Sequence, residues 1–166
     1  MMLETERLTI RKLTVDDAPF FFELVNDDDW IRFIGDRNVH TISDAEDYIK
    51  NRIMASYSQS GFGFYLVSEK STNIPLGISG FVKREQLEHA DVGFAFLPIG
   101  RGKGYAYEST KALMDYGKKE FQFTTILAIA NNDNERSHSL LKKIGLQFKE
   151  HIRLYEEEDE ISLFST

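Results

Sequence analysis

The chain opens with alternating apolar and polar positions and then changes to the spacing typical of helices. Leu8 and Ile10 alternate with polar neighbours, which predicts a short first strand that includes Lys12. Thr14 followed three residues later by Asp17 predicts a capping box that opens a helix. The apolar face of that helix is formed by Ala18, Phe21, Phe22 and Val25.

A polar loop, anchored by apolar residues, separates this helix from a second one. We expect the anchors to be Trp30, Phe33 and Ile34. Ser43 and Glu46 predict a second capping signal, and the helix that follows should end near Gly61.

From residue 62 onward the apolar period becomes that of strands. We expect strands over 62–70, 76–84 and 91–97, a helix after the glycines of 100–104, and a strand over 125–130. A short helix stopped by Gly145 and two strands over 148–155 and 160–164 complete the chain. The order β-α-α-β-β-β-α-β-α-β-β predicts a mixed α/β fold in which helices surround a central sheet.

Composition limits the classes of protein that this chain can belong to. With 166 residues, the chain is long enough for one core and predicts a single domain, 1–166. No cysteine is present, which excludes a disulfide framework, a thiolate metal site and a cysteine nucleophile. The histidines show no spacing typical of metal ligands, so we expect no metal.

The charge balance and the apolar pattern bear on partners and location. A formal net charge of −7 argues against nucleic-acid binding and is compatible with a cationic substrate such as an amine. No apolar run predicts a membrane span or a signal peptide, so we expect a cytoplasmic protein without a membrane partner. The acidic runs 27–29 and 156–160 could line an acceptor path or be solvated turns.

A glycine-rich basic segment lies between a predicted strand and a predicted helix. It reads Gly100-Arg101-Gly102-Lys103-Gly104. Glycines allow backbone N–H groups to converge, and a helix N-terminus adds partial positive charge. With Arg101 and Lys103 as countercharge, the segment predicts a phosphate or pyrophosphate site. The sequence matches neither a Walker loop nor the G-x-G-x-x-G dinucleotide fingerprint.

Three segments carry a resemblance to a known family. The pattern Arg-x-x-Gly-x-Ala at Arg101, Gly104 and Ala106 resembles the acetyl-CoA pyrophosphate loop of the GNAT N-acetyltransferase superfamily. Asn131, Asn134, Ser137 and the stretch 140–148 resemble its N-x-x-S…L-L-x-K-x-G-F segment. The opening E-T-E-R-L-T-I-R of residues 4–11 is similar to the first strand of the RimJ/RimL-like branch.

The resemblance implies a fold and a set of acetyl-CoA contacts. The fold is a mixed, mostly antiparallel central sheet flanked by helices. The backbone of Phe94, Phe96 and Leu97 would bind the pantetheine arm. Asn134 would hydrogen-bond the same arm, Ser137 would lie near the thioester sulfur, and Asn131 belongs to the same cofactor-binding set. Lys142 or Lys143 would contact the adenosine phosphates, although a solvated helix face is the favoured interpretation of both lysines. The pyrophosphate would be held by the N–H groups of Arg101, Gly102, Lys103, Gly104, Tyr105 and Ala106.

Acyl transfer to an amine needs a base, a stabilised oxyanion and a proton for the leaving thiolate. The resemblance makes Asp91 the candidate base, unless it merely pairs with a basic neighbour. It makes the N–H of Phe96 or Leu97 the oxyanion donor. Residues 135–139 lack the tyrosine that many family members use as the acid, so Ser137 is the substitute, unless it only bonds its own backbone.

The resulting prediction is an acetyl-CoA-dependent N-acetyltransferase that works by direct attack in a ternary complex. The RimJ/RimL resemblance favours the α-amine of a protein or peptide N-terminus as acceptor. The alternatives are a small amine (a polyamine, amino sugar or amino acid) or a non-catalytic acyl-CoA-binding module. The sequence allows a monomer or a homodimer.

Overall fold

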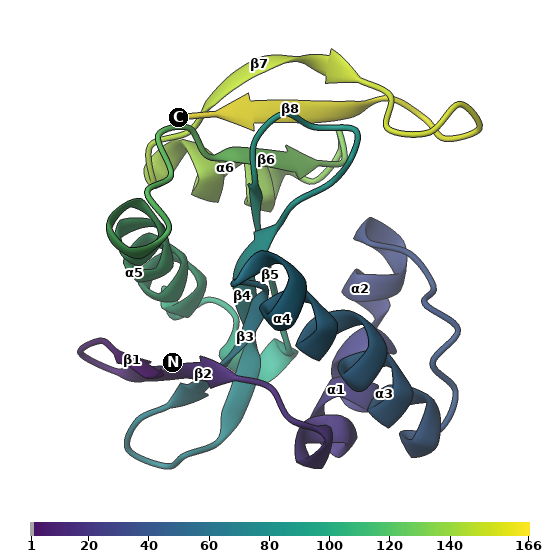
Figure 1. Ribbon diagram of the computed structural model, residues 1–166, viewed down its shortest axis with the longest axis vertical. Coiled ribbons are helices and arrows are strands. Elements are labelled where there is room, and N and C mark those ends of the chain that lie inside the picture. Colours follow the sequence, from purple (N-terminus) through teal and green to yellow (C-terminus); the bar gives the residue numbers. More distant parts are fainter. Residues whose placement is uncertain (1) are drawn as a thin grey trace.

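The computed structural model describes residues 2–166 and arranges eight strands of that range in one sheet (Figure 1). Their order across the sheet is β1-β2-β3-β4-β5-β6-β8-β7. The strands are β1 (Met2–Glu4), β2 (Leu8–Lys12), β3 (Phe64–Glu69), β4 (Pro75–Val82), β5 (Asp91–Phe96), β6 (Leu127–Ala130), β7 (Gln147–Ile152) and β8 (Ile161–Ser165). All neighbouring strands are antiparallel except β5 and β6, which confirms the predicted mostly antiparallel sheet.

The parallel pair of β5 and β6 divides the sheet in the middle. A single register position, Asp91 opposite Leu127, joins the two strands. By contrast, β5 is paired with β4 along its whole length, from Asp91 to Phe96. The strands β6, β7 and β8 therefore turn away from the first five, as Figure 1 shows, and a gap opens between the later residues of β5 and β6.

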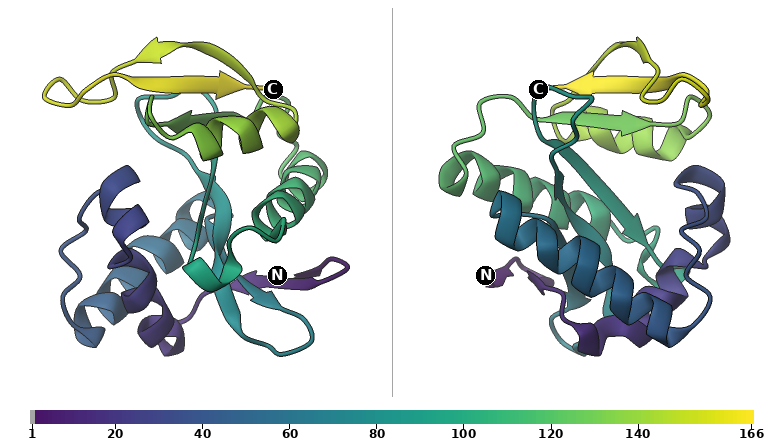
Figure 2. Two further views of the ribbon diagram at one scale, coloured as in Figure 1. Left: turned by 180° about the vertical axis from the view of Figure 1, so that it is seen from behind. Right: turned by 45° about the vertical axis from the view of Figure 1, so that its right-hand side comes forward.

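Helices cover both faces of the sheet (Figure 2). The long helix α5 (Tyr105–Glu120) lies on one face, and α6 (Glu135–Lys143) packs beside it against β6 and β7. On the other face lies α1 (Ala18–Val25), together with a continuous helical segment made of α3 (Ile42–Tyr48), a π-helical stretch (Ile49–Met54) and α4 (Ala55–Ser60). A short helix, α2 (Asp28–Phe33), follows α1.

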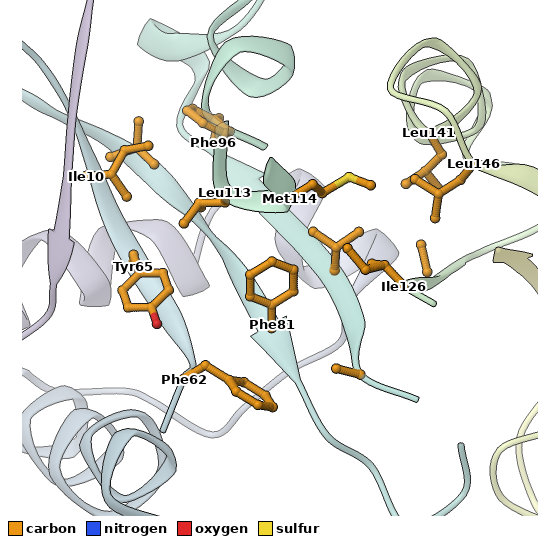
Figure 3. Packing of buried hydrophobic residues seen from close by; sticks show 14 of the residues in the cluster. Ile10, Phe62, Tyr65, Phe81, Phe96, Leu113, Met114, Ile126, Leu141 and Leu146 are labelled. Atoms are coloured by element: carbon orange, nitrogen blue, oxygen red, sulfur yellow. The ribbon is translucent and has the colours of Figure 1, made fainter. Parts of the chain in front are cut away.

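Each face of the sheet has its own apolar cluster. Under α5, the fully buried Phe81 of β4 lies next to Leu113 and Met114 of the helix, as Figure 3 shows. On the other face, Phe21 of α1 packs with Ile49 and with strand residues such as Leu66. Alternate residues of each central strand therefore enter different clusters, which explains why these strands are almost continuously apolar.

Several predicted helix ends are confirmed, together with the residues that were expected to form them. Thr14 and Asp17 form the capping box, and the Asp17 carboxylate accepts the Thr14 N–H at 2.9 Å. That box opens a short 3₁₀ turn (Val15–Asp17) before α1. Gly61 and Gly145 both end helices with positive φ, 80° and 104°.

Other local predictions are wrong. The expected loop around Trp30 is the helix α2, because Asp27 caps it by accepting the Asp29 N–H. The second helix is capped by Thr41 rather than Ser43, since the Thr41 hydroxyl accepts the Asp44 N–H at 3.0 Å. The strand β1 was not predicted at all. In residues 2–166 no helix is both long and apolar enough to cross a membrane.

Candidate active site

The gap between β5 and β6 exposes backbone groups that a neighbouring strand would normally satisfy. At the end of β5, the Leu97 N–H donates to the Leu76 carbonyl of β4 at 2.9 Å. At its start, the Ala90 carbonyl accepts the Leu127 N–H at 3.0 Å, on the β6 side. Because hydrogen-bonding direction alternates along a strand, the N–H and C=O groups of Phe94 and Phe96 point toward the gap.

The three residues that were predicted to hold a pantetheine arm therefore differ in which backbone groups they leave free for a ligand. Phe94 directs both of its backbone groups to the gap. The carbonyl of Phe96 accepts the Nε of Arg101 at 3.0 Å, which leaves its N–H for a ligand. Leu97 offers no free N–H, because its own is bonded to Leu76. Of the two expected oxyanion donors, Phe96 is thus the available one.

The glycine-rich loop follows a 3₁₀ turn (Pro98–Gly100) and ends as the N-cap of α5. Gly102 and Gly104 have positive φ, 74° and 81°, which a residue with a side chain rarely adopts. The Arg101 N–H closes the turn onto the Pro98 carbonyl at 3.2 Å. Within the described chain, no hydrogen bond engages the N–H groups of the five residues Gly102, Lys103, Gly104, Tyr105 and Ala106.

The Arg101 side chain is directed to α2. Its guanidinium forms ion pairs with Asp27 and, at 3.3 Å, with Asp29. Two carboxylates therefore already neutralise the charge that was expected to balance a phosphate. The acidic run 27–29 is in consequence not a free solvated turn, since Asp27 and Asp29 anchor α2 to the loop.

Lys143 approaches the same helix end from α6. Its Nζ lies 4.5 Å from the centroid of the Tyr107 ring, in the first turn of α5. The structure thus brings Lys143 and the glycine-rich loop together, although 39 residues separate Lys143 from Gly104 in the sequence. Lys103, the lysine of the glycine-rich loop itself, has an exposed side chain.

The asparagine–serine segment begins α6 at the far side of the gap. Asn134 is the N-cap, and its Oδ1 accepts the Ser137 N–H at 3.3 Å. The amide of Asn131 donates to the Phe33 carbonyl of α2 at 3.0 Å, so Asn131 fixes α2 from the β6 side. The Ser137 hydroxyl is half-buried and makes no hydrogen bond within residues 2–166, so the alternative of a serine bonded to its own backbone is not observed.

Asp91 is buried at the point where β5 and β6 separate. Its side chain is 3% exposed, and Oδ1 accepts from the Arg84 Nε at 3.0 Å. Burial raises the pKa of Asp91 to about 6, although the charge and hydrogen bond of Arg84 act to lower it. The carboxylate therefore pairs with a basic neighbour and also has a pKa close to the range that suits a general base.

The residues of this site offer no metal centre. Among residues 2–166, no group of three or more histidine or acidic side chains is arranged to hold a metal ion. The loop glycines and the unbonded N–H groups instead suit an anion such as a pyrophosphate, because a side chain at Gly102 or Gly104 would be strained and would cover the donors.

Comparison with known proteins decides the family. Residues 7–147 match the family model of the acetyltransferase (GNAT) domain. The chain belongs to the GNAT family. It is accordingly an acetyltransferase, as predicted.

Individual relatives agree with this assignment. The chain is 28% identical over 155 residues to YoaA of Bacillus subtilis, an uncharacterized N-acetyltransferase, with 93% of this chain and 87% of that protein covered. It is 25% identical to a GNAT-family acetyltransferase from Bacillus anthracis, whose crystal structure superposes with a TM-score of 0.82 over 100% of this chain and 98% of that one. RimL, a ribosomal L7/L12 alpha-N-protein acetyltransferase in complex with coenzyme A, is 16% identical and shares the fold, with a TM-score of 0.84 over 100% of this chain and 97% of that one.

Two features of this GNAT site were not predicted from the sequence. The first is the pairing of Arg101 with Asp27, residues 74 positions apart. The second is a set of contacts from Arg7 to the glycine-rich loop, 96 positions away. No local motif signals either pair, because each depends on how distant elements are brought together.

Proposed function

We propose that this GNAT protein transfers an acetyl group from acetyl-CoA to the α-amine of a protein or peptide N-terminus by direct attack in a ternary complex. The observation that carries the proposal is that two sets of unused backbone donors lie on one stretch of the chain, residues 94–106. One set lies in the glycine-rich loop, at Gly102 to Ala106, and the other in the gap beside β5, at Phe94 and Phe96. A ligand with a pyrophosphate at one end and an amide-containing arm at the other matches both.

The glycine-rich loop is the proposed pyrophosphate site. The N–H groups of Gly102, Lys103, Gly104, Tyr105 and Ala106 would donate to it, supported by the N-terminal end of the α5 dipole. Lys103 and Lys143 would supply countercharge, in place of the Arg101 guanidinium that is paired with α2. The backbone of Phe94 and the amide of Asn134 are the proposed partners of the pantetheine arm, opposite each other across the gap.

The chemistry of transfer is assigned to three groups around the gap. Acetyl-CoA supplies an activated acyl carbon and a thiolate leaving group. Asp91 would accept the proton of the attacking amine, through an ordered water where the carboxylate does not reach the amine directly. The Phe96 N–H would stabilise the developing oxyanion, and the unbonded Ser137 hydroxyl would supply a proton to the thiolate. With no cysteine in the chain, an acyl-cysteine intermediate is excluded.

A base as weak as Asp91 favours an acceptor of low pKa, such as an α-amine, over a lysine-type amine. An α-amine has a pKa of about 8 and a lysine-type amine about 10.4. Proton transfer to Asp91, whose pKa is about 6, is therefore unfavourable by about 3 kcal/mol for the α-amine and by about 6 kcal/mol for the more basic amine. A base of this strength suits an acceptor that is already partly neutral at physiological pH.

The experiment is to measure release of the CoA thiol with a thiol reagent, using a panel of peptides with free N-termini beside a panel of polyamines, amino sugars and amino acids. The protein contributes no background, because it contains no cysteine. Release with peptides alone would support the proposed acceptor. Release with small amines alone would replace it with the small-amine alternative, and CoA binding without release on either panel would contradict the transfer reaction.

A further inference from the structure

The turn between β1 and β2 is fastened to the glycine-rich loop by Arg7. The guanidinium Nη1 donates to the Lys103 carbonyl at 2.9 Å, and Nε donates to the Glu108 carboxylate at 2.7 Å. The Arg7 N–H also donates to Glu108, at 3.0 Å, and so does the Thr5 hydroxyl, at 2.6 Å. The same guanidinium lies 4.4 Å from the centroid of the Tyr105 ring. Arg7 is thus held in one orientation by three groups of the loop and of α5: the Lys103 carbonyl, the Glu108 carboxylate and the Tyr105 ring.

The contact with Lys103 determines the direction of a neighbouring donor. In a planar trans peptide the carbonyl and the following N–H point in opposite directions. When Arg7 holds the Lys103 carbonyl on the outer side of the loop, the Gly104 N–H is directed to the inner side. That N–H is one of the five that no other group of the described chain engages.

The loop itself does not fix this peptide. Lys103 lies between two glycines with positive φ, and a glycine occupies positive and negative φ with similar ease. Rotation about the bonds flanking the Lys103–Gly104 peptide therefore meets no side chain at Gly104. An outside contact is required to keep the carbonyl from occupying the position of the N–H.

We propose that Arg7 is a positioning residue for acetyl-CoA: it holds the Lys103–Gly104 peptide so that the Gly104 N–H is presented to the pyrophosphate. Glu108 and Thr5 hold Arg7 in turn. This inference rests on the proposed function, because it assumes that the loop binds the pyrophosphate. It gives a physical role to Thr5 and Arg7 of the turn between β1 and β2, which lie too far along the sequence from the loop to be linked to it by pattern.

A direct contact is the competing explanation. Arg7 borders a cavity of about 400 Å³ next to the loop, and the side chain is 42% exposed, so it could instead bind the 3′-phosphate of CoA. The two explanations differ in one respect: only a direct contact needs the 3′-phosphate.

The test compares Arg7→Met with a matched control. Arg11→Met removes an arginine of β2 that is 39% exposed and pairs with Asp17 rather than with the loop. The dissociation constants of CoA and of 3′-dephospho-CoA are measured by calorimetry, and KM and kcat are measured with acetyl-CoA. Thermal unfolding of each variant reports folding, and Arg7→Lys serves as a milder change that can reach Lys103 or Glu108 but not both.

We expect Arg7→Met to weaken binding about tenfold, the loss typical of one hydrogen bond to a charged group. The loss of affinity should be the same for CoA and 3′-dephospho-CoA, and KM for acetyl-CoA should rise while kcat is unchanged. The affinity of Arg7→Lys should be intermediate. The affinity of Arg11→Met should stay within about twofold of that of the parent. A loss that disappears with 3′-dephospho-CoA, equal effects of Arg7→Met and Arg11→Met, or a fall in kcat alone would overturn the inference.

Calorimetry separates this inference from the proposed function. If the parent protein binds CoA but acetylates no amine, the transfer reaction is wrong and the Arg7 comparison still stands. If the parent does not bind CoA, both are wrong.

Discussion

Replacing Asp91 with asparagine keeps the shape of this buried side chain and removes its charge. The pKa of about 6 lies above the ordinary value of 3.8. Between these pH values the folded protein holds a proton that the unfolded chain has released, so the contribution of Asp91 to stability falls as the pH rises. The difference between the two pKa values corresponds to about 3 kcal/mol, by which the ionised carboxylate lowers the free energy of unfolding at neutral pH.

The measurable quantity is the difference in free energy of unfolding between Asp91→Asn and the parent protein. Any fixed effect of the new amide on Arg84 cancels when this difference is compared at two pH values. Between pH 4.5 and pH 7.5, we expect the difference to change by about 2 kcal/mol in favour of the variant. Urea unfolding at the two pH values measures it. A difference that does not depend on pH would show that the carboxyl titrates near its ordinary pKa, and the reasoning would be refuted.

The same variant tests the assignment of the base. Loss of a general base lowers the rate by about 10²–10⁴-fold, so Asp91→Asn should lose at least about 99% of kcat. In the parent, kcat/KM should rise with pH through about 6, where the base becomes ionised, and this limb should be absent from the variant. Full activity in a folded variant would exclude Asp91 as the base.

Two further predictions use glycines with matched controls. Gly104→Ala should raise KM for acetyl-CoA about tenfold, because the backbone at this position has a φ of 81° and the new Cβ lies in the loop. Its control, Gly145→Ala, has a φ of 104° outside the loop, so it should lower the melting temperature and leave KM unchanged. Gly80→Ala should destabilise the fold by about 3 kcal/mol or more in urea unfolding, since its Cβ would lie 2.1 Å from the backbone oxygen of Gly63. Gly93→Ala, which would meet only the Phe64 ring at 3.3 Å, should cost about 1 kcal/mol or less, and equal costs at the two positions would contradict the packing argument.

Sequence patterns predicted the parts of the fold whose signal is local. The capping box of Thr14 and Asp17 lies within one turn, and Gly145 ends α6 through its own backbone conformation. The glycine-rich loop could be predicted for the same reason. Its backbone donors are placed by two glycines on either side of Lys103 and by the start of one helix.

The features that could not be predicted from the sequence depend on contacts between distant segments. The six-residue helix α2 looks like a loop, because three consecutive aspartates are poor helix formers. Asp27 caps it, and Arg101 and Asn131 hold its two ends from opposite sides of the gap. Arg101 was accordingly expected to face a phosphate, whereas tertiary contacts direct it to α2.

The central claim, transfer of an acetyl group to an α-amine, is tested most directly by one competition. A peptide with a free N-terminus and one internal lysine is incubated with the protein and ¹³C-labelled acetyl-CoA, and fragment masses locate the label. We expect label on the N-terminal α-amine, with the lysine unmodified. Label on the lysine alone would contradict the central claim. A peptide without label on either amine would also contradict it, provided that acetyl-CoA is shown to bind to the protein.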